Sequence, residues 1–292
     1  MSYIGRFAPS PTGPLHFGSL LAALASWLEA RAAGGRWLLR IEDVDRLREA
    51  PGAADAIRQT LESFGLTWDG EIVRQSGRDA LYQARLDELT RRGLVYRCDC
   101  SRSSIKARGA RQYDGHCRNR AVPATGAYAL RLRVDAAPEA FEDLLQGRLA
   151  VAPGLAGEDF ILRRKEGFWS YQLAVVSDDI AQGITDVVRG SDLIDSTPGQ
   201  LVLYRLLGAS APRFLHIPVA LGPDGQKLSK QTFARPLVDG EGAALVRALD
   251  FLGQEPPAAL AGAGCAEVLA WAQAHWRRER IPPVLGLPES VR

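Results

Sequence analysis

The chain has 292 residues, enough for one large domain with an insertion or for two domains. Apolar residues make up 46% and charged residues 24% of it, as in an ordinary globular enzyme. The net charge of +2 excludes a strong overall field for nucleic acid, and no apolar run reaches the about 18 residues that a membrane span needs.

The first part of the chain alternates between predicted strands and helices. In chain order these are a strand over 3–8, a helix from Ser19 to about Gly35, a strand over 37–43 and a helix over 53–64. This order predicts a parallel sheet with right-handed crossovers. Ligands of such sheets bind outside the carboxyl ends of the strands, so Pro9–Gly13 and Glu42–Asp45 are expected at one crevice.

The pattern changes at Val95. Residues 98–157 are rich in Arg, Gly and Pro with weak periodicity, which indicates an insertion. The other predicted elements are a helix over 82–92, strands over 160–164, 169–176 and 186–190, and a helix over 196–207 that begins at Ser196-Thr197-Pro198. After Lys230 the pattern is helical, with breaks at Pro256-Pro257 and Pro282-Pro283.

His16 and Gly18 stand where the first long helix begins. A helix N-terminus offers unpaired N–H groups and a partial positive charge, and a glycine allows close approach of a ligand. These features suit a phosphate, although a lone His before a Gly is more often structural. Ser19 belongs to the same segment.

A second phosphate-binding candidate is the segment Lys227-Leu228-Ser229-Lys230-Gln231, just after the turn signal G-P-D-G. Two lysines on a mobile loop can close over a triphosphate and neutralise charge in the transition state. Alone, such a pair would usually be solvated surface.

Four motifs in a fixed order carry a family resemblance. They are P-S-P-T-G-x-L-H-x-G, R-I-E-D-x-D-R, R-G-x-D-L-x-D-S-T-P-x-Q-x-x-L-Y-R-L-L-G and K-L-S-K. From residue 3 to about 235 the chain resembles class I aminoacyl-tRNA synthetases of the glutamyl type. The resemblance implies an α/β, Rossmann-type parallel-sheet core that activates glutamate with ATP, accompanied by Mg²⁺. It assigns catalytic roles to His16, Lys227 and Lys230, with Gly18 and Ser19 beside the nucleotide.

Glutamate needs cations for its side-chain carboxylate and an anion for its ammonium group. Arg6 and Arg189 offer guanidinium forks and Glu42 offers the anion, although each arginine could instead be an ordinary core ion-pair partner. The resemblance implies that the pocket is lined by Arg6, Phe7, Ala8, Pro9, Ser10, Glu42, Tyr171 and Arg189.

One position departs from the glutamyl pattern. The family usually continues Tyr-x-Leu-Ala with Asn, whereas Val175 follows Ala174 here. Losing that amide predicts a looser pocket and weaker binding of the amino acid, an expectation that Val175→Asn with unchanged glutamate affinity would contradict.

The insertion holds a candidate metal site. Cys98, Cys100 and Cys117 give three possible thiolates on a segment poor in apolar residues, and a structural Zn²⁺ could hold such a segment together. Three reduced bystander thiols are the alternative. Ligand chemistry favours His116 as the fourth ligand, although its adjacency to Cys117 strains the geometry. The family resemblance points instead to Tyr113, and we follow it.

The length of the sequence after Lys230 indicates which molecule could accept the activated glutamate. Residues 231–292 are too few for the large helical anticodon-binding region of a glutamyl-tRNA synthetase. With P-L-H-F-G-S-L and C-x-C…Y-x-x-x-C, the chain closely resembles the glutamyl-queuosine tRNA(Asp) synthetase subfamily. The resemblance implies activation of glutamate without tRNA and transfer to queuosine at the wobble position of tRNA(Asp). Arginines of the insertion and the run Trp276–Arg280 are candidate RNA contacts, and a solvated helix end is the plainer account of that run.

Three alternatives stay open. They are a minimal glutamyl-tRNA synthetase charging an acceptor end, a glutamate ligase acting on a non-RNA amine or hydroxyl, and a non-catalytic RNA-binding paralogue. The intact His16, Gly18, Lys227 and Lys230 speak against the last of these.

Four stretches summarise the expected organisation: the first half of the core over 1–97, the zinc-binding insertion over 98–165, the second half of the core over 166–215, and the lysine loop with a helical region over 216–292. A monomer in the cytoplasm is expected, because no secretion signal, membrane span or exposed apolar stripe stands out.

Overall fold

The computed structural model of the chain describes residues 2–110, 112–152, 155, 157–222, 224–228 and 236–289. Three residues of the predicted lysine loop, Ser229, Lys230 and Gln231, lie outside the described residues. No helix among the described residues is long and apolar enough to cross a membrane.

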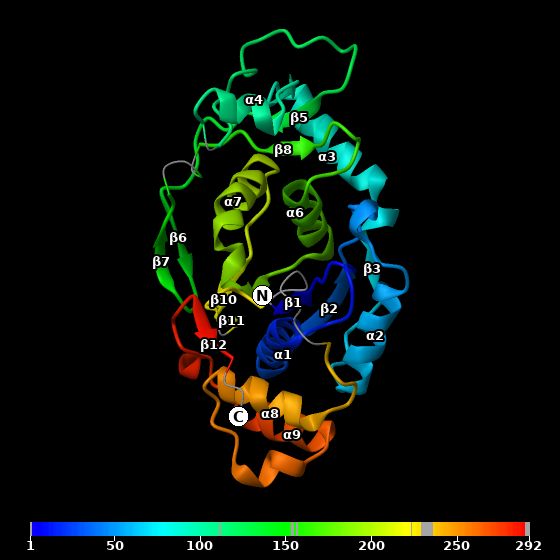
Figure 1. The fold of residues 1–292 in the computed structure, drawn as a ribbon, viewed down its shortest axis with the longest axis vertical. Helices are drawn as coiled ribbons and strands as arrows, with labels where there is room; N and C mark the ends of the chain where they lie inside the picture. The colour runs from blue at the N-terminus through cyan, green and yellow to red at the C-terminus, as the bar shows by residue number, and fades with distance from the viewer. Residues whose placement is uncertain are drawn as a thin grey trace.

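Two sheets of mainly parallel strands form the centre of the molecule (Figure 1). The first has the order β1-β2-β3, with β1 at Ile4–Phe7, β2 at Arg36–Ile41 and β3 at Val73–Arg74. All of its strands are parallel. β1 and β2 are the two strands predicted over 3–8 and 37–43.

The second sheet has the order β7-β6-β10-β9. Its bounds are β6 at Ala140–Asp143, β7 at Gly147–Ala150, β9 at Asp186–Gly190 and β10 at Arg213–Ile217. β6, β10 and β9 are parallel, and β7 is antiparallel to β6. Two strands from the range 98–165 therefore extend the core sheet.

Hydrogen bonds join the two sheets where β1 and β9 begin. Thr185 N donates to Ile4 O at 2.9 Å, and Ile4 N donates to Thr185 Oγ1 at 2.8 Å. From this junction the chain adds β2 and β3 on one side and β10 and β6 on the other. Ligands of doubly wound sheets bind where the strand order reverses, beyond the carboxyl ends. The predicted parallel α/β core is confirmed.

Helices cover the sheets in two groups with separate apolar cores. The first group is α1 at Phe17–Ala32, α2 at Ala53–Ser63, α8 at Gly242–Phe251 and α9 at Cys265–His275. The second is α3 at Asp79–Arg91, α6 at Tyr171–Gln182 and α7 at Thr197–Leu206. Buried residues occur all round α1, as expected of a helix packed between a sheet and two further helices. In Figure 1, α8 and α9 lie below α1.

The strand predicted over 169–176 is wrong, because this range begins α6. Ser170 Oγ accepts a hydrogen bond from Leu173 N at 3.3 Å, which caps the helix start, and Gly183 with φ of 66° ends the helix in the left-handed conformation. The apparent alternation arises because both faces of α6 are largely buried.

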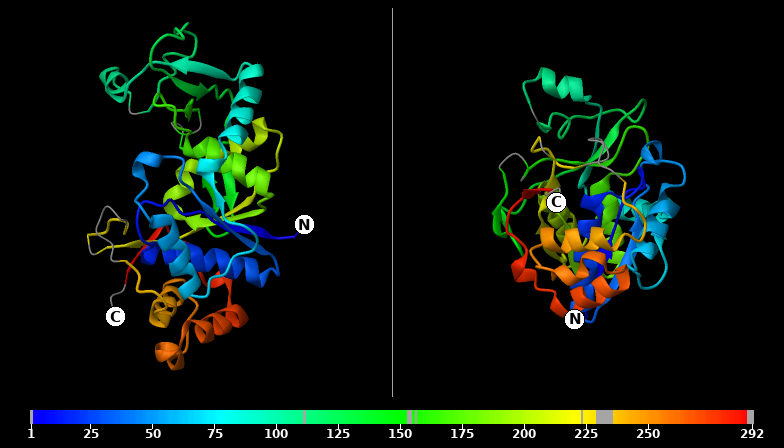
Figure 2. Two further views of the ribbon diagram at one scale, coloured as in Figure 1. Left: turned by 90° about the vertical axis from the view of Figure 1, so that its right-hand side faces the viewer. Right: turned by 60° about the horizontal axis from the view of Figure 1, so that its bottom comes forward.

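The insertion lies at one end of the molecule, opposite α8 and α9 (Figures 1 and 2). It contains an antiparallel sheet of order β4-β5-β8 and the short helix α4. The bounds are β4 at Val95–Cys98, α4 at Arg102–Ala107, β5 at Ala129–Leu132 and β8 at Ile161–Arg163. Its own apolar cluster contains only Cys98, Tyr113, Cys117 and Val122 as buried residues within the described part of the chain.

A last pair of strands lies beside the second sheet. β11 at Val219–Leu221 pairs in parallel with β12 at Gly286–Pro288. Short 3-10 helices connect several elements, at Arg46–Arg48, Gln75–Gly77, Ser191–Ser196, Ala258–Gly262 and Arg278–Arg280.

The run Trp276–Arg280 ties the C-terminal region to α1. Trp276 Nε1 donates to Glu29 Oε1 at 2.7 Å, and Arg278 Nε donates to Glu29 Oε2 at 2.9 Å. Glu29 is buried. Trp276 and Arg278 are therefore engaged within the protein, whereas Arg277 and Arg280 are exposed.

Candidate active site

A cleft of about 690 Å³ opens where the strand order reverses. Most of the side chains that the sequence predicted for glutamate and ATP line it: Arg6, Phe7, Ala8, Pro9, Ser10, His16, Gly18, Ser19, Glu42, Tyr171, Arg189 and Lys227. Lys230 lies outside the described residues. Arg48 and Asp192 also line the cleft and were not predicted to do so.

His16 is the N-cap residue of α1 and has extended backbone geometry. A Cβ at Gly18 would lie 3.1 Å from His16 Cε1 and 3.3 Å from Nδ1, so the imidazole occupies space that a larger residue would need. The N-terminus of this 16-residue helix therefore faces the cleft beside an imidazole. This arrangement suits an anion.

The described residues on both sides of the lysine loop lie near this helix start. Lys227 Nζ donates to Asp192 Oδ2 at 2.5 Å, and Leu228 N donates to Ala220 O at 2.8 Å. Beyond the loop, Pro236 forms an antiparallel bridge with His16. Lys227 and His16, which are far apart in the sequence, therefore border the same cleft.

A buried ionic network supports the floor of the cleft. Arg6 Nε lies 3.2 Å from Asp179 Oδ1, and Arg40 NH1 lies 2.8 Å from the same carboxylate oxygen. Arg40 NH2 also donates to Glu42 Oε1 at 3.3 Å. Arg40 is fully buried. Asp179 and Arg40 thus fix the two predicted glutamate-binding residues at the ends of β1 and β2.

Burial changes the ionisation of this network. It raises the pKa of Glu42, and the nearby Arg40 and Arg6 only partly offset the effect. Burial also opposes the charge of Asp179, but Arg6 and Arg40 outweigh it and lower the pKa of that carboxyl. Burial raises the pKa of Tyr171, so its hydroxyl stays protonated. A cationic ligand beside Glu42 would therefore favour its ionised form and lower its pKa.

Val175 is buried and packs in the second apolar core, and it does not line the cleft. Tyr171, one turn earlier on α6, does line it. Among the described residues, Val175 therefore makes no direct contribution to the lining of the cleft that could explain the predicted effect on glutamate binding.

Three thiols of the insertion come together. The sulfur atoms of Cys98, Cys100 and Cys117 lie within 4.8 Å of one another, and Cys100 Sγ is 3.5 Å from Cys117 Sγ. Four ligands at Zn–S distances of about 2.3 Å would place sulfur atoms about 3.8 Å apart. The spacing fits a shared metal ion and is too long for a disulfide bond, in which S–S is about 2.05 Å.

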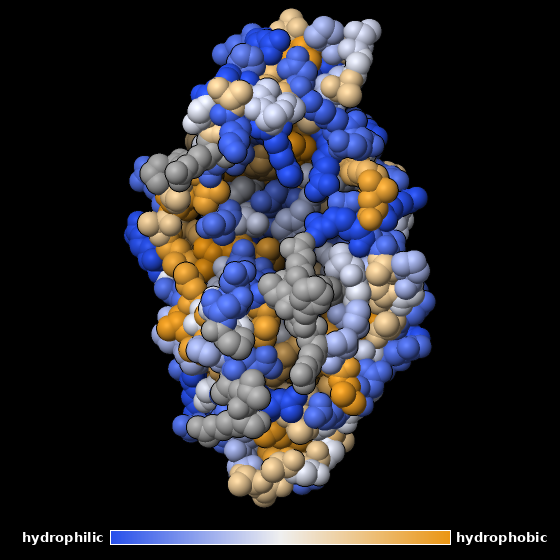
Figure 3. Space-filling model, viewed as in Figure 1, coloured by the Kyte–Doolittle hydropathy of each residue, from blue (hydrophilic) through white to orange (hydrophobic). Residues whose placement is uncertain are grey.

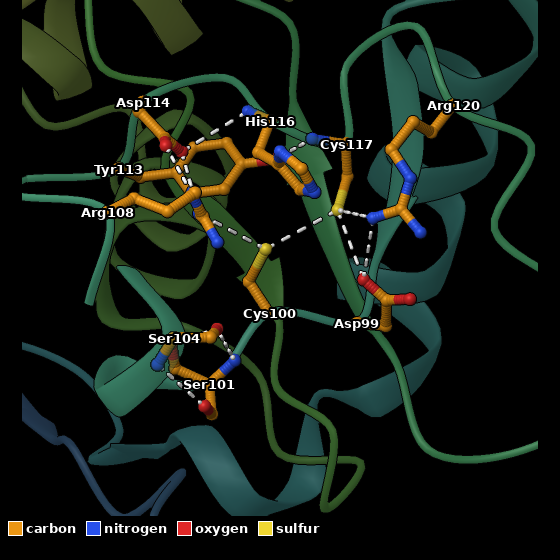
Figure 4. Close-up of polar contacts among 10 residues, drawn as sticks. All are labelled: Asp99, Cys100, Ser101, Ser104, Arg108, Tyr113, Asp114, His116, Cys117 and Arg120. Carbon is orange, nitrogen blue, oxygen red and sulfur yellow. Dashed lines mark hydrogen bonds and ion pairs between the residues drawn. The ribbon is translucent and has the colours of Figure 1, made fainter. Parts of the chain in front are cut away.

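Local structure fixes the positions of these thiols (Figure 4). Cys98 ends β4, and Cys100 directly precedes Ser101, the N-cap residue of α4. Reciprocal hydrogen bonds between Ser101 and Ser104 fix the start of that helix. Cys117 N donates to Tyr113 Oη at 2.8 Å, which brings the phenol to the cluster. Tyr113 is buried, whereas His116 is exposed and is not in the thiol group, a comparison within the described residues.

Arginines surround the cluster. Arg108 NH2 lies 3.5 Å from Cys100 Sγ and Arg120 NH1 lies 3.6 Å from Cys117 Sγ, on opposite sides in Figure 4. Arg131 stacks 3.7 Å from the centre of the Tyr113 ring. Burial, followed by a hydrogen bond to Asp99, raises the pKa of Cys117 to about 11. A metal ion would therefore have to displace the Cys117 proton.

The arginines that the sequence suggested as RNA contacts form ion pairs within the insertion. Arg108 pairs with Asp114 at 2.6 Å, Arg118 with Asp135 at 2.7 Å and Arg120 with Asp99 at 3.4 Å. Arg111 lies outside the described residues.

A parallel α/β sheet with a cleft at the reversal of its strand order is the arrangement in which nucleotide-binding enzymes place their site. Residues 4–256 match the family described as tRNA synthetases class I (E and Q), catalytic domain, and the chain therefore belongs to this family. Membership makes the chain a ligase, for which ATP is the expected co-substrate.

Two named relatives and one solved structure are similar to the chain over nearly its full length. A protein named Glutamyl-Q tRNA(Asp) synthetase from Ectopseudomonas mendocina (strain ymp) is 53% identical over 290 residues, which are 99% of this chain and 98% of the relative. One of the same name from Serratia proteamaculans (strain 568) is 52% identical over 281 residues, 96% of this chain and 92% of the relative. Among solved structures, a glutamate tRNA ligase from Elizabethkingia meningosepticum CCUG26117 in complex with its amino acid has a TM-score of 0.81 at 25% identity, covering 99% of this chain and 67% of that one.

Proposed function

We propose that the chain activates L-glutamate with ATP in the absence of tRNA and transfers the glutamyl group to queuosine at the wobble position of tRNA(Asp). The observation that carries the proposal is the match, over nearly the full length of both chains, to proteins named glutamyl-Q tRNA(Asp) synthetase. The convergence of the predicted glutamate and ATP residues on one cleft supports it.

In the first step an α-carboxylate oxygen of glutamate attacks the α-phosphorus of ATP, the bond to the bridging oxygen breaks, and pyrophosphate leaves. Arg6 and Arg189 bind the side-chain carboxylate and Glu42 binds the ammonium group. The α1 N-terminus, His16, Lys227 and Lys230 stabilise the charge on the phosphates, with Gly18 and Ser19 against the nucleotide and Mg²⁺ accompanying it.

In the second step a hydroxyl of the queuosine cyclopentenediol attacks the carbonyl carbon of the adenylate. A new ester forms, AMP leaves, and the hydroxyl proton passes to solvent. Figure 3 shows that the surface is hollowed between the insertion and the core, with hydrophilic side chains above the hollow and to its right and hydrophobic ones at its lower left. An anticodon arm could lie in this hollow, with the insertion on one side.

The test offers labelled glutamate and ATP with tRNA(Asp) that carries queuosine, with tRNA(Asp) that lacks it, and with no RNA. We expect pyrophosphate exchange in all three mixtures and labelled RNA only in the first. Label on the 3′ end of a tRNA would support the acceptor-end alternative. Exchange without any RNA product would favour a non-RNA acceptor, and no exchange would favour a binding protein.

We further propose that the chain works as a monomer in the cytoplasm, where thiols remain reduced. The division into a core over 1–97 and 166–215, an insertion over 98–165 and a final region over 216–292 stays a proposal.

The affinity for glutamate should fall as the pH is lowered. Because Glu42 has a raised pKa in the free cleft, it takes up a proton at a higher pH than an ordinary glutamate. A bound ammonium group favours the ionised form, so binding releases this proton and weakens on acidification. We expect KM for glutamate to rise as the pH falls through the raised pKa.

The matching variant is Glu42→Gln. It should raise KM for glutamate about 10–100-fold, the cost of losing one charged hydrogen bond, and flatten the pH dependence. Glu62→Gln, on the exposed side of α2, is the control. A Glu42→Gln enzyme that keeps the wild-type pH profile would contradict the role of Glu42.

We propose that Cys98, Cys100, Cys117 and Tyr113 hold one structural Zn²⁺. The thiol spacing and the buried position of Tyr113 next to Cys117 support this set. Bound zinc would stabilise an insertion whose own apolar cluster is very small.

Removing a zinc ligand should unfold the insertion and leave the core folded. Cys117→Ser is expected to lower the zinc affinity by more than the about 10–100-fold that an outer hydrogen-bond partner contributes. Tyr113→Phe should also lose zinc, whereas His116→Ala and Cys265→Ser should keep it. Metal content and protease sensitivity of residues 98–130 measure this. Stoichiometric zinc in Tyr113→Phe with none in His116→Ala would reverse the assignment of the fourth ligand.

A further inference from the structure

Arg189 is held by side chains that do not line the cleft. Its Nε donates to His216 Nε2 at 3.0 Å, and its NH2 donates to Thr197 Oγ1 at 2.8 Å. Among the described residues, its third nitrogen, NH1, is buried and has no hydrogen-bond partner. Arg189 itself lines the cleft. NH1 is consequently the nitrogen that remains for a ligand.

The contact with Arg189 fixes the tautomer of His216. A guanidinium group can only donate hydrogen bonds, so Nε2 of His216 must accept and carries no proton. The ring proton therefore sits on Nδ1, which donates to Asp143 Oδ2 at 2.7 Å. His216 is fully buried, stacked on Phe214 at 5.9 Å and in edge contact with Phe141 at 6.4 Å.

Asp143 is in turn fixed by backbone donors. Its Oδ1 accepts from Leu145 N at 3.0 Å and Gln146 N at 2.9 Å, and its Oδ2 accepts from His216 N at 3.1 Å. Asp143 ends β6, which pairs in parallel with β10, the strand that carries His216. The burial of Asp143 opposes its charge, but His216 and the backbone donors lower its pKa. The carboxylate is thus an ionised, fixed acceptor for Nδ1–H.

We propose that Asp143 and His216 are positioning residues that hold Arg189 so that NH1 faces the carboxylate of the amino-acid substrate. The proposal rests on the proposed function in one respect, the binding of glutamate by Arg189. Asp143 selects the tautomer of His216, His216 accepts from Arg189 Nε, and Thr197 holds NH2. A strand from within the range 98–165 thereby sets the specificity of the cleft.

Asp143→Asn is the sharpest variant. Backbone N–H groups favour the amide oxygen at the Oδ1 position, which leaves the amide NH₂ facing His216 Nδ1. The ring must then carry its proton on Nε2, opposite the N–H of Arg189. His216→Gln is the rescue variant, because its amide oxygen can accept from Arg189 Nε and Asp143 keeps its backbone contacts. His216→Leu removes the acceptor.

Two measurements are made on each variant. Long-range ¹H–¹⁵N spectra report the tautomer of His216, one of only 4 histidines, and the Arg189 Nε–H signal reports its hydrogen bond. ATP–pyrophosphate exchange gives KM for glutamate and for ATP. We expect an Nδ1–H tautomer in the wild type and an Nε2–H tautomer in Asp143→Asn. KM for glutamate should rise roughly tenfold or more in Asp143→Asn and His216→Leu, less in His216→Gln, with KM for ATP unchanged.

The outcomes distinguish a failure of the positioning role from a failure of the proposed function. An Nε2–H tautomer in the wild type, or an unmoved Arg189 Nε–H signal in both Asp143→Asn and His216→Leu, overturns the positioning role whatever the substrate is. A tautomer change with unchanged KM for glutamate overturns it as well. A wild type that shows the expected spectra but no glutamate-dependent exchange refutes the proposed function and leaves the positioning of Arg189 supported. If Asp143→Asn does not fold, the comparison of His216→Gln with His216→Leu decides.

Discussion

Replacing Asp179 with alanine is expected to lower the free energy of unfolding by about 3–5 kcal/mol, the usual cost of breaking a buried ion pair from one side. Asp179 binds Arg6 at 3.2 Å and Arg40 at 2.8 Å, and all three side chains are almost completely buried. Alanine would leave two guanidinium groups in a low-dielectric interior. Urea unfolding followed by circular dichroism measures the loss.

The pH dependence of this loss has a defined sign. The pKa of Asp179 is lowered in the fold, so its contribution is present above the pKa of an unfolded aspartate, about 3.9, and is lost as the pH falls through the lowered value. Wild type and Asp179→Ala should therefore differ fully at neutral pH and converge only in strong acid.

Asp179→Asn and an exposed pair provide the comparison. Asparagine keeps the volume and one acceptor, so it should cost less than alanine and still raise KM for glutamate, because Arg6 loses its ionic partner. Glu62→Ala breaks the exposed pair with Arg58 at 2.7 Å and should cost about 0.5 kcal/mol or less. A loss in Asp179→Ala no larger than that of Glu62→Ala would show that the network does not support the cleft.

Part of the cleft could be predicted, because several of its polar residues stand at or just after the carboxyl ends of parallel strands. Ala8–Ser10 follow β1, Glu42 follows β2, and Arg189 lies near the end of β9. The rule that ligands bind beyond the carboxyl ends of such strands places Pro9–Gly13 and Glu42–Asp45 at one crevice without any knowledge of the side-chain packing. The family resemblance added Arg189. Their motif spacing then separates them from the many other charged residues of the chain.

The supporting residues could not be predicted in the same way. Asp179 lies 173 positions from Arg6, and Asp143 lies 73 positions from His216. Neither pair has a local pattern that links its members, and Asp143 stood in a range expected to be an insertion. A buried carboxylate looks like any other in sequence, because only the packed structure shows that its partners are arginine or histidine.

A local pattern misled at α6, and the C-terminal region mixes buried and exposed side chains. Trp169, Tyr171 and Leu173 alternate with polar residues as in a strand. In the structure, however, Leu173–Asp179 are all buried in one helix, polar residues included. At the C-terminal region the buried Glu29 binds Trp276 and Arg278, whereas the neighbouring Arg277 and Arg280 are exposed. In each case tertiary burial, which sequence periodicity does not encode, decided the outcome.

Replacing Lys230 with alanine is expected to reduce the rate of ATP–pyrophosphate exchange about 10²–10³-fold, through loss of roughly 3–4 kcal/mol of transition-state stabilisation. The residues that flank the loop lie beside the helix start that faces the cleft, since Leu228 lines the cleft and Pro236 pairs with His16. A contact made only in the transition state lowers kcat and leaves KM for glutamate unchanged. Lys106→Ala, on α4 in the insertion, is the control and should exchange at the wild-type rate.

Lys227→Ala separates charge neutralisation from transition-state binding. Lys227 is paired with Asp192 at 2.5 Å at the edge of the cleft, so alanine would leave the Asp192 carboxylate facing the incoming phosphates. Repulsion between the two anions should raise KM for ATP, an effect that added salt weakens because both groups are partly exposed. Lys230→Ala should show no such salt-dependent KM. Undiminished exchange in Lys230→Ala would refute the catalytic role of that lysine, and equal effects of both variants on KM for ATP alone would assign both lysines to ground-state binding.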